Sequence, residues 1–152
     1  MPSINMNAEA KVARVLLADD HAEIMMQTRK VLAGEFDIVG SVANGADLIK
    51  SAARLDPDVV VLDITMPGLD GIEAARRLKH AGCRAKIVFL TVHEDPDYVR
   101  AAQQSGGAAY VVKARLASDL VTAIHEALED HRFVSPTLGL NGTGQPKDRR
   151  KS

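Results

Sequence analysis

Five polar residues are candidates for chemistry because each follows an apolar, strand-like run. Asp19 and Asp20 follow VARVLLA, Asp63 follows VVVL, Thr91 follows AKIVFL and Lys113 follows AYVV. Three carboxylates in one cleft repel each other and attract a hard divalent cation such as Mg²⁺, which also takes water and phosphate oxygens. A lysine ammonium and a threonine hydroxyl would suit the spread negative charge of a transferring phosphoryl group. The five residue types therefore predict Mg²⁺-dependent phosphoryl chemistry if the fold brings them together.

The elements that must position these residues alternate along the chain. Five strand-like and five helix-like patterns follow one another through short connections, which predicts an α/β fold with a doubly wound, parallel, five-stranded sheet of order 2-1-3-4-5. In that order the first and third strands are neighbours, so all five polar residues meet at the carboxyl edge of the sheet. We expect strands at 11–19, 36–42, 59–63, 85–91 and 108–113, and helices at 22–33, 44–54, 71–80, 95–105 and 116–130.

The central stretch, VVVLDITMPGLDG at 59–71, is the most informative. Its four apolar, mainly β-branched residues predict a strand buried on both faces. Pro67 and Gly68 turn the chain, and Asp70 with Glu73 forms a start for the next helix that is similar to a capping box. Asp63 is therefore expected on a loop that presents it.

Composition indicates one soluble globular domain. The chain has 152 residues, 46% hydrophobic and 26% charged, and its single cysteine, Cys83, excludes an internal disulfide framework and fits a reducing compartment. No apolar run approaches the roughly 18 residues of a membrane span, so we expect a cytoplasmic protein without membrane contact. We expect a flexible N-terminus at 1–10, one domain at 11–131 and a flexible basic tail at 132–152. The net charge of −1 argues against direct nucleic-acid binding.

Taken together, these motifs resemble the receiver domain of two-component response regulators, over roughly residues 12–130. The matching elements are the pair Asp19-Asp20, the DITMPGLDG stretch, Thr91 after an apolar strand, and AYVVK ending at Lys113. The resemblance is closest to the NarL/FixJ class. It implies a flavodoxin-like (βα)5 fold and a phosphoacceptor switch rather than a turnover enzyme, although receivers take part in their own phosphorylation and dephosphorylation.

The resemblance also assigns roles to individual residues. Asp63 would accept a phosphoryl group from a sensor histidine kinase, a phosphotransfer protein or a small donor. Asp19 and Asp20 would hold Mg²⁺ with Asp63 and with the backbone carbonyl of Thr65. Lys113 would pair with Asp63 and then with the phosphoryl oxygens.

Further positions would read out or tune the phosphorylated state. The Thr91 hydroxyl would move toward the phosphate and Tyr110 would pack inward, signalling to a protein partner that the sequence does not name. Thr65 and His93 match positions that tune the lifetime of the acylphosphate. His21 and His93 are expected to be exposed or outside the innermost ligand shell, because an acid-rich site prefers oxygen to imidazole.

Several alternatives stay open. Each acid alone is more often a turn or capping residue, and Thr91, Lys113 and Tyr110 alone have ordinary structural roles. A haloacid-dehalogenase-type enzyme would be expected to show Asp-x-Asp, but Ile64 and Thr65 follow Asp63. A degenerate receiver would serve only for interaction, and a dinucleotide site lacks G-x-G-x-x-G after the first strand.

Departures and the chain ends raise further questions. Many receivers have proline after the lysine, whereas Ala114 follows Lys113 here, so this peptide bond is expected to be trans or strained. The chain is interpreted as a single-domain regulator, or alternatively as the receiver fragment of a NarL/FixJ-type transcription factor without its DNA-binding domain, since RFVSP at 132–136 is similar to the segment leading to that domain. A homodimer is also considered, with apolar side chains supplied by Met25, Met26, Tyr98 and Val99.

Overall fold

The protein forms a parallel sheet with helices packed on both faces. The structure, a computed structural model, describes residues 12–66, 70–92 and 95–136. The sheet order is β2-β1-β3-β4-β5-β6, and each neighbouring pair is parallel. The strands are β1 (Arg14–Ala18), β2 (Asp37–Val42), β3 (Val59–Asp63), β4 (Lys86–Thr91), β5 (Gly107–Val112) and β6 (Phe133–Val134).

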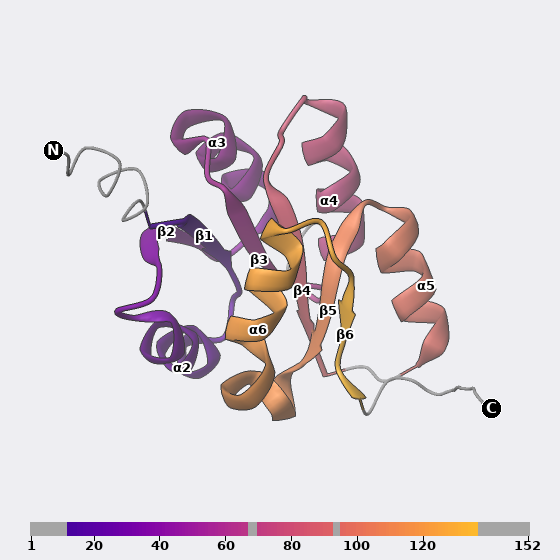
Figure 1. The fold of residues 1–152 in the computed structure, drawn as a ribbon. Helices are drawn as coiled ribbons and strands as arrows, with labels where there is room; N and C mark the ends of the chain where they lie inside the picture. The colour runs from indigo at the N-terminus through magenta and orange to yellow at the C-terminus, as the bar shows by residue number, and fades with distance from the viewer. Residues whose placement is uncertain (1–11, 67–69, 93–94, 137–152) are drawn as a thin grey trace, which may run out of the picture.

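Among the residues that the structure describes, five α-helices and one short 3₁₀ turn connect the strands. They are α2 (Ala22–Leu32), α3 (Gly45–Leu55), α4 (Gly71–His80), α5 (Pro96–Gln104), the turn η1 (Lys113–Arg115) and α6 (Leu116–Leu128). Figure 1 shows α2 and α6 on one face of the sheet and α3, α4 and α5 on the other. The expected fold class is therefore confirmed, including the order 2-1-3-4-5 of the first five strands.

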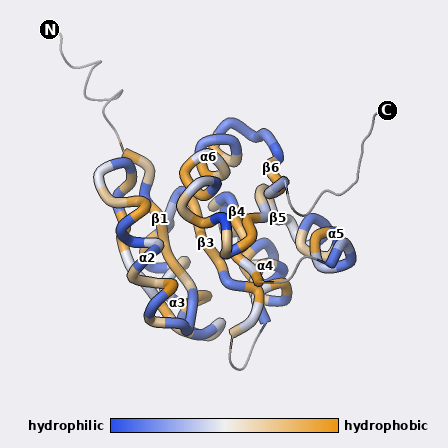
Figure 2. Tube along the Cα trace, turned by 90° about the horizontal axis from the view of Figure 1, so that it is seen from below, coloured by the Kyte–Doolittle hydropathy of each residue, from blue (hydrophilic) through white to orange (hydrophobic). Residues whose placement is uncertain are grey.

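Successive side chains of β3 point to opposite faces of the sheet, so the strand contributes to a hydrophobic core on each face. Val59 and Val61 pack with α2 and α6, whereas Val60 and Leu62 pack with α3, α4 and α5. All five residues of β3 are buried, as expected for a central strand covered on both faces. In Figure 2 the hydrophobic strands lie in the middle and the hydrophilic helix faces point outward.

Side-chain caps fix where the helices begin on the site-bearing loops. Asp70 accepts a hydrogen bond from the Glu73 amide at 2.9 Å and starts α4, which confirms the predicted start. Asp95 accepts one from the Asp97 amide at 2.9 Å, with Pro96 in the first turn of α5. Asn44 caps α3 in the same way.

The expected flexible tail from 132 onward is wrong for its first residues. Phe133 and Val134 add a sixth strand to the edge of β5, and Ser135 is fully buried. A two-residue strand is too short to leave a periodic pattern in the sequence, so only the tertiary contacts reveal it. Residues 1–11 and 137–152, which hold the rest of both expected flexible ends, lie outside the described residues.

Two other expectations concern the backbone and the membrane. Within the described ranges no peptide bond is cis, so the bond between Lys113 and Ala114 is trans. Over the same ranges, no helix is both long enough and apolar enough to cross a bilayer.

Candidate phosphoryl-transfer site

The acids lie at the carboxyl ends of β1 and β3, which are adjacent strands. Ala18 is in register with Leu62, so the residues that follow, Asp19 and Asp63, come side by side. Asp19 is 6% exposed and Asp63 is 2% exposed, whereas the Asp20 side chain is 30% exposed. Ligand atoms of these three acids and of His21 all lie within 4.8 Å of one another.

Lys113 reaches this cluster from the end of β5. Its Nζ atom lies 3.3 Å from Asp19 Oδ2 and 3.2 Å from Asp63 Oδ2, and its side chain is 7% exposed. A single ammonium group thus bridges the two buried carboxylates. Because three carboxylates face one lysine, the cluster retains a net negative charge.

Burial and the neighbouring acid both act on Asp63. Burial raises the pKa of this carboxyl and the negative charge of Asp19 raises it further, while Lys113 and a hydrogen bond from the Thr65 amide act in the opposite direction. The Thr65 amide donates to Asp63 Oδ1 at 3.1 Å. The net shift is upward, so the ionised form of Asp63 is costly without a further cation.

The donor set fits a hard divalent cation. Asp19 Oδ2 and Asp63 Oδ2 are buried and both face the single Lys113 ammonium, so each oxygen keeps a lone pair for a further ligand. Carboxylate oxygens are preferred Mg²⁺ ligands. Asp19, Asp20 and Asp63 are therefore able to hold the cation, and the expected role of the Thr65 carbonyl stays a prediction.

Thr91 and Tyr110 lie on neighbouring strands near the cluster. Thr91 is the last residue of β4, and its side chain lies close enough to the Tyr110 hydroxyl on β5 to affect the pKa of that group. Burial raises the pKa of Tyr110 to about 12, and this contact with Thr91 offsets part of the effect. Tyr110 is 1% exposed and its ring centroid lies 6.4 Å from that of Phe89, so the tyrosine already points inward.

His21 lies closer to the acids than the sequence indicated. Its Nδ1 atom is 3.1 Å from Asp19 Oδ1, 3.3 Å from Asp20 Oδ1 and 3.6 Å from Asp63 Oδ2, although its side chain is 55% exposed. Its backbone amide also donates to Asp19 Oδ1 at 2.8 Å. The position directly after the acid pair is the signal that identifies it. The other histidine considered, His93, lies outside the described residues.

Comparison with known proteins gives the family. The sequence model of the response regulator receiver domain matches residues 15–125. The chain belongs to the receiver-domain family. This receiver is 34% identical to the response regulator GacA of Pseudomonas aeruginosa over 127 residues, which are 82% of the chain and 59% of that protein. It is 37% identical to the transcriptional regulatory protein PdtaR of Mycobacterium tuberculosis, over 88% of the chain and 65% of that protein.

Other relatives include NarL-type and LuxR-family regulators. It is 31% identical to the nitrate/nitrite regulator NarL of Escherichia coli, over 83% of the chain and 59% of NarL. A LuxR-family response regulator from Aurantimonas matches with a TM-score of 0.80 and 30% identity, over 84% of this chain and 93% of that one. The isolated receiver of RcsB from Salmonella enterica, solved with BeF₃⁻, matches with a TM-score of 0.77 and 26% identity, over 84% and 96%. The receiver therefore spans less than two thirds of the curated relatives named here.

Proposed function

We propose that Asp63 accepts a phosphoryl group from a sensor histidine kinase or a phosphotransfer protein in a Mg²⁺-dependent reaction. The observation that supports this most directly is the bridge from Lys113 Nζ to two buried carboxylates, at 3.3 and 3.2 Å. Burying two acids and one lysine together costs desolvation free energy, and apolar residues of similar volume would often stabilise the fold at least as well. Three strand ends that converge on one reactive carboxylate favour a chemical role.

In the transfer step an Asp63 oxygen attacks the donor's phosphorus. The new bond joins this oxygen to phosphorus, while the bond from phosphorus to the donor atom breaks and its electron pair leaves with the donor. Asp19, Asp20, Asp63 and the Thr65 carbonyl would hold Mg²⁺, which when bound neutralises charge on the acids and on the phosphoryl oxygens. Lys113, released from Asp63, pairs with a phosphoryl oxygen.

The signal then passes through Thr91 and Tyr110. Phosphorylation replaces one negative charge by nearly two and adds strong acceptors, which draws the Thr91 hydroxyl toward the phosphate. The Thr91 side chain lies close to the Tyr110 hydroxyl, so a movement of Thr91 would change the surroundings of the Tyr110 ring on β5. The surface formed by α5, β5 and α6 would carry the change to a partner. Thr65, whose side chain is exposed beside the site, and His93 would tune the lifetime of the phosphate.

Two settings for this switch are proposed. In the first, the receiver acts alone and contacts a protein partner through its switch surface. In the alternative, it is the receiver of a NarL/FixJ-type transcription factor, which agrees with its spanning 59% of GacA and NarL. RcsB dimers bound to DNA are known from a solved structure that the receiver matches over 66% of that chain.

A homodimer would use the apolar side chains left on the surface. Of the four considered, Met26 on α2 is 58% exposed and Tyr98 on α5 is 38% exposed. Met25 and Val99 are instead half-buried against the core, which makes them weaker candidates. An interface centred on α2 or α5 is therefore favoured over one that requires all four residues.

The test is intact-protein mass spectrometry after incubation with acetyl phosphate and Mg²⁺. The wild type should gain one phosphoryl group, and Asp63→Asn should gain none. Asp37→Asn, which changes an exposed acid at the start of β2, should behave as wild type. A wild type that gains no phosphoryl group and does not bind beryllofluoride would refute the proposal.

A further inference from the structure

A buried serine ties the C-terminal strand to the end of β5. Ser135 is fully buried, and its hydroxyl oxygen accepts a hydrogen bond from the Val112 amide at 3.1 Å and donates one to Asp119 Oδ2 at 2.8 Å. Its own amide donates to the Tyr110 carbonyl at 2.9 Å. One residue of β5 on each side of Val111 is therefore held by Ser135.

Asp119 extends this connection to the far end of the η1 turn. It lies in the first turn of α6. Arg115 donates two hydrogen bonds to the Asp119 carboxylate, from Nε to Oδ2 at 2.8 Å and from a second guanidinium nitrogen to Oδ1 at 3.2 Å. Asp119 is 5% exposed, yet the hydrogen bonds from Arg115 and Ser135 outweigh its burial and lower its pKa, so it is ionised when it receives them. Charge-assisted, two-point contacts of this kind fix geometry well.

Lys113 lies between these two anchors. Val112, held by Ser135, precedes it directly, and Arg115, held by Asp119, ends the turn that Lys113 begins. Ala114 sits inside the turn and does not restrict its own backbone as proline would. The path of the chain at Lys113 is thus set by contacts from outside the turn.

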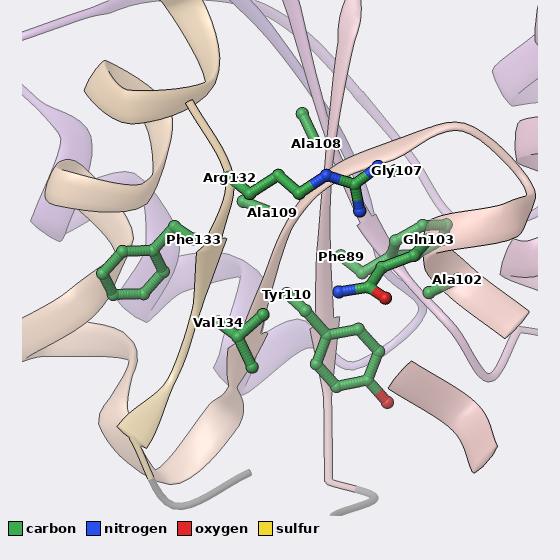
Figure 3. Close-up of a pocket in the computed structure, with 10 residues that line it drawn as sticks. All are labelled: Phe89, Ala102, Gln103, Gly107, Ala108, Ala109, Tyr110, Arg132, Phe133 and Val134. Atoms are coloured by element: carbon green, nitrogen blue, oxygen red, sulfur yellow. The ribbon is translucent and has the colours of Figure 1, made fainter. Parts of the chain in front are cut away.

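The two residues before Ser135 pair with β5 along the edge of the sheet. Tyr110 is in register with Val134, and Ala109 with Phe133. The cavity between β6 and α5 measures about 10 Å³, which is room for roughly one water molecule. Figure 3 shows Val134 and Tyr110 on the same side of the sheet at this cavity, with Phe133 pointing to the other face.

We propose that Ser135 is a positioning residue for Lys113, so that β6 belongs to the phosphoryl-transfer machinery as well as to the fold. This inference rests on the proposed function of Asp63. Through Val112 and Asp119, Ser135 fixes the turn from which the lysine stem reaches Asp19 and Asp63. Without the hydroxyl, Lys113 Nζ samples positions away from the incoming phosphoryl group and transfer slows.

The experiment measures the phosphorylation rate with acetyl phosphate and Mg²⁺ for the full chain and its variants. Ser135→Ala should lower the rate at subsaturating donor about tenfold. Ser105→Ala is the matched control, because Ser105 is also buried and its hydroxyl donates one hydrogen bond, to Ala102 O at 2.8 Å, away from Lys113. It should keep the wild-type rate.

A double-mutant cycle separates positioning from general destabilisation. In a Lys113→Met background, Ser135→Ala should cause no further loss of rate, because its effect runs through the lysine. An equal tenfold loss in both backgrounds, or a wild-type rate for Ser135→Ala, would overturn the inference.

The remaining variant covers the case in which Ser135→Ala does not fold. Arg115→Gln removes the ion pair with Asp119, and the Arg115 side chain is 38% exposed, so the protein should still fold. The phosphorylation rate should fall, by a smaller factor than in Ser135→Ala. An unchanged rate for Arg115→Gln would also overturn the inference. A wild type that is not phosphorylated would refute the proposed function itself, whereas normal phosphorylation with no effect of these variants refutes the role of Ser135 alone.

Discussion

At Asp63 the protein holds a carboxylate whose ionisation works against folding. Burial and the charge of Asp19 raise its pKa above the ordinary value of 3.8 despite the nearby Lys113. The folded state therefore binds a proton more readily than the unfolded state, and this contribution to stability is lost as pH rises from 3.8 through the folded-state pKa. Asp63→Asn removes the cost. Its free energy of unfolding at pH 7 should exceed that of wild type by about 1 kcal/mol.

Urea unfolding of wild type and Asp63→Asn across pH checks this sign. The two proteins should converge as pH falls below 3.8, where Asp63 is protonated in both states. Asp37→Asn, at an exposed position, supplies the baseline and should show no such convergence. An Asp63→Asn protein that is less stable than wild type at pH 7 would show that the pair with Lys113 outweighs the burial of charge.

Bound Mg²⁺ should offset the free-energy cost of the buried, ionised Asp63. The buried oxygens of Asp19 and Asp63 that share the Lys113 ammonium keep lone pairs for a cation, so we expect Mg²⁺ to bind the folded state preferentially. At about five times its Kd it should stabilise the wild type by about 1 kcal/mol. Thermal melts with Mg²⁺ and with EDTA measure this difference. Asp63→Asn should show a smaller rise, and an equal rise in both would place the cation elsewhere.

Strand order predicts the proximity of some residues of the site, whereas the contacts of others depend on side-chain orientation or on the sixth strand. Asp63 ends a strand, and Asp19 and Lys113 directly follow strands. In a parallel sheet the strand order alone brings such positions together, so their meeting was predictable. The contacts of His21 depend on how one side chain turns over the acids. The link from Ser135 to Val112 spans 23 residues and depends on a strand that the pattern does not indicate.

At the scale of elements, α4 is packed against the acceptor loop with no space between backbones. A Cβ atom on Gly71 would lie 2.3 Å from the Asp63 carbonyl oxygen and 2.7 Å from Ile64 Cα. Gly71→Ala must therefore push the start of α4 away from β3 and shift Asp63. We expect a loss of about 2–4 kcal/mol in the free energy of unfolding and slower phosphorylation.

Gly40→Ala is the matched control for this prediction. Its Cβ would meet the ends of two leucine side chains, Leu55 Cδ1 at 3.1 Å and Leu16 Cδ1 at 3.3 Å, which are able to move aside. Denaturant melts and phosphorylation rates should show a smaller loss of stability, about 1 kcal/mol, and a wild-type rate. Equal effects of the two substitutions on the rate would contradict the close packing of α4 on the acceptor loop.

For the whole molecule, the described fold ends with Ser135 and Pro136 rather than with α6. A protein ending at Pro136 should keep the wild-type stability and phosphorylation rate. One ending at His131 loses β6 and the Ser135 hydrogen bonds, and should lose about 2–4 kcal/mol of stability. Urea unfolding of both truncated proteins measures the difference, and equal midpoints would show that β6 contributes little.

The overall fold was largely predictable, because alternating patterns and short connections admit few topologies. The five helices and the order of the first five strands are confirmed in the structure. The sixth strand was missed because Phe133 and Val134 are held by the exposed backbone edge of β5, and edge pairing of so few residues leaves no periodic signature.

The direction of β6 also decides where the chain leaves the domain. Helix α6 returns the chain to the edge opposite the phosphorylation site, where Asp130 pairs with Lys86 at the start of β4. Because β6 runs parallel to β5, it carries the chain back until Ser135 lies beside Val112. A module attached after Pro136 would therefore be tethered at the same edge of the sheet as the reactive aspartate, three strands away from β3, whereas one attached after Asp130 would be tethered at the opposite edge.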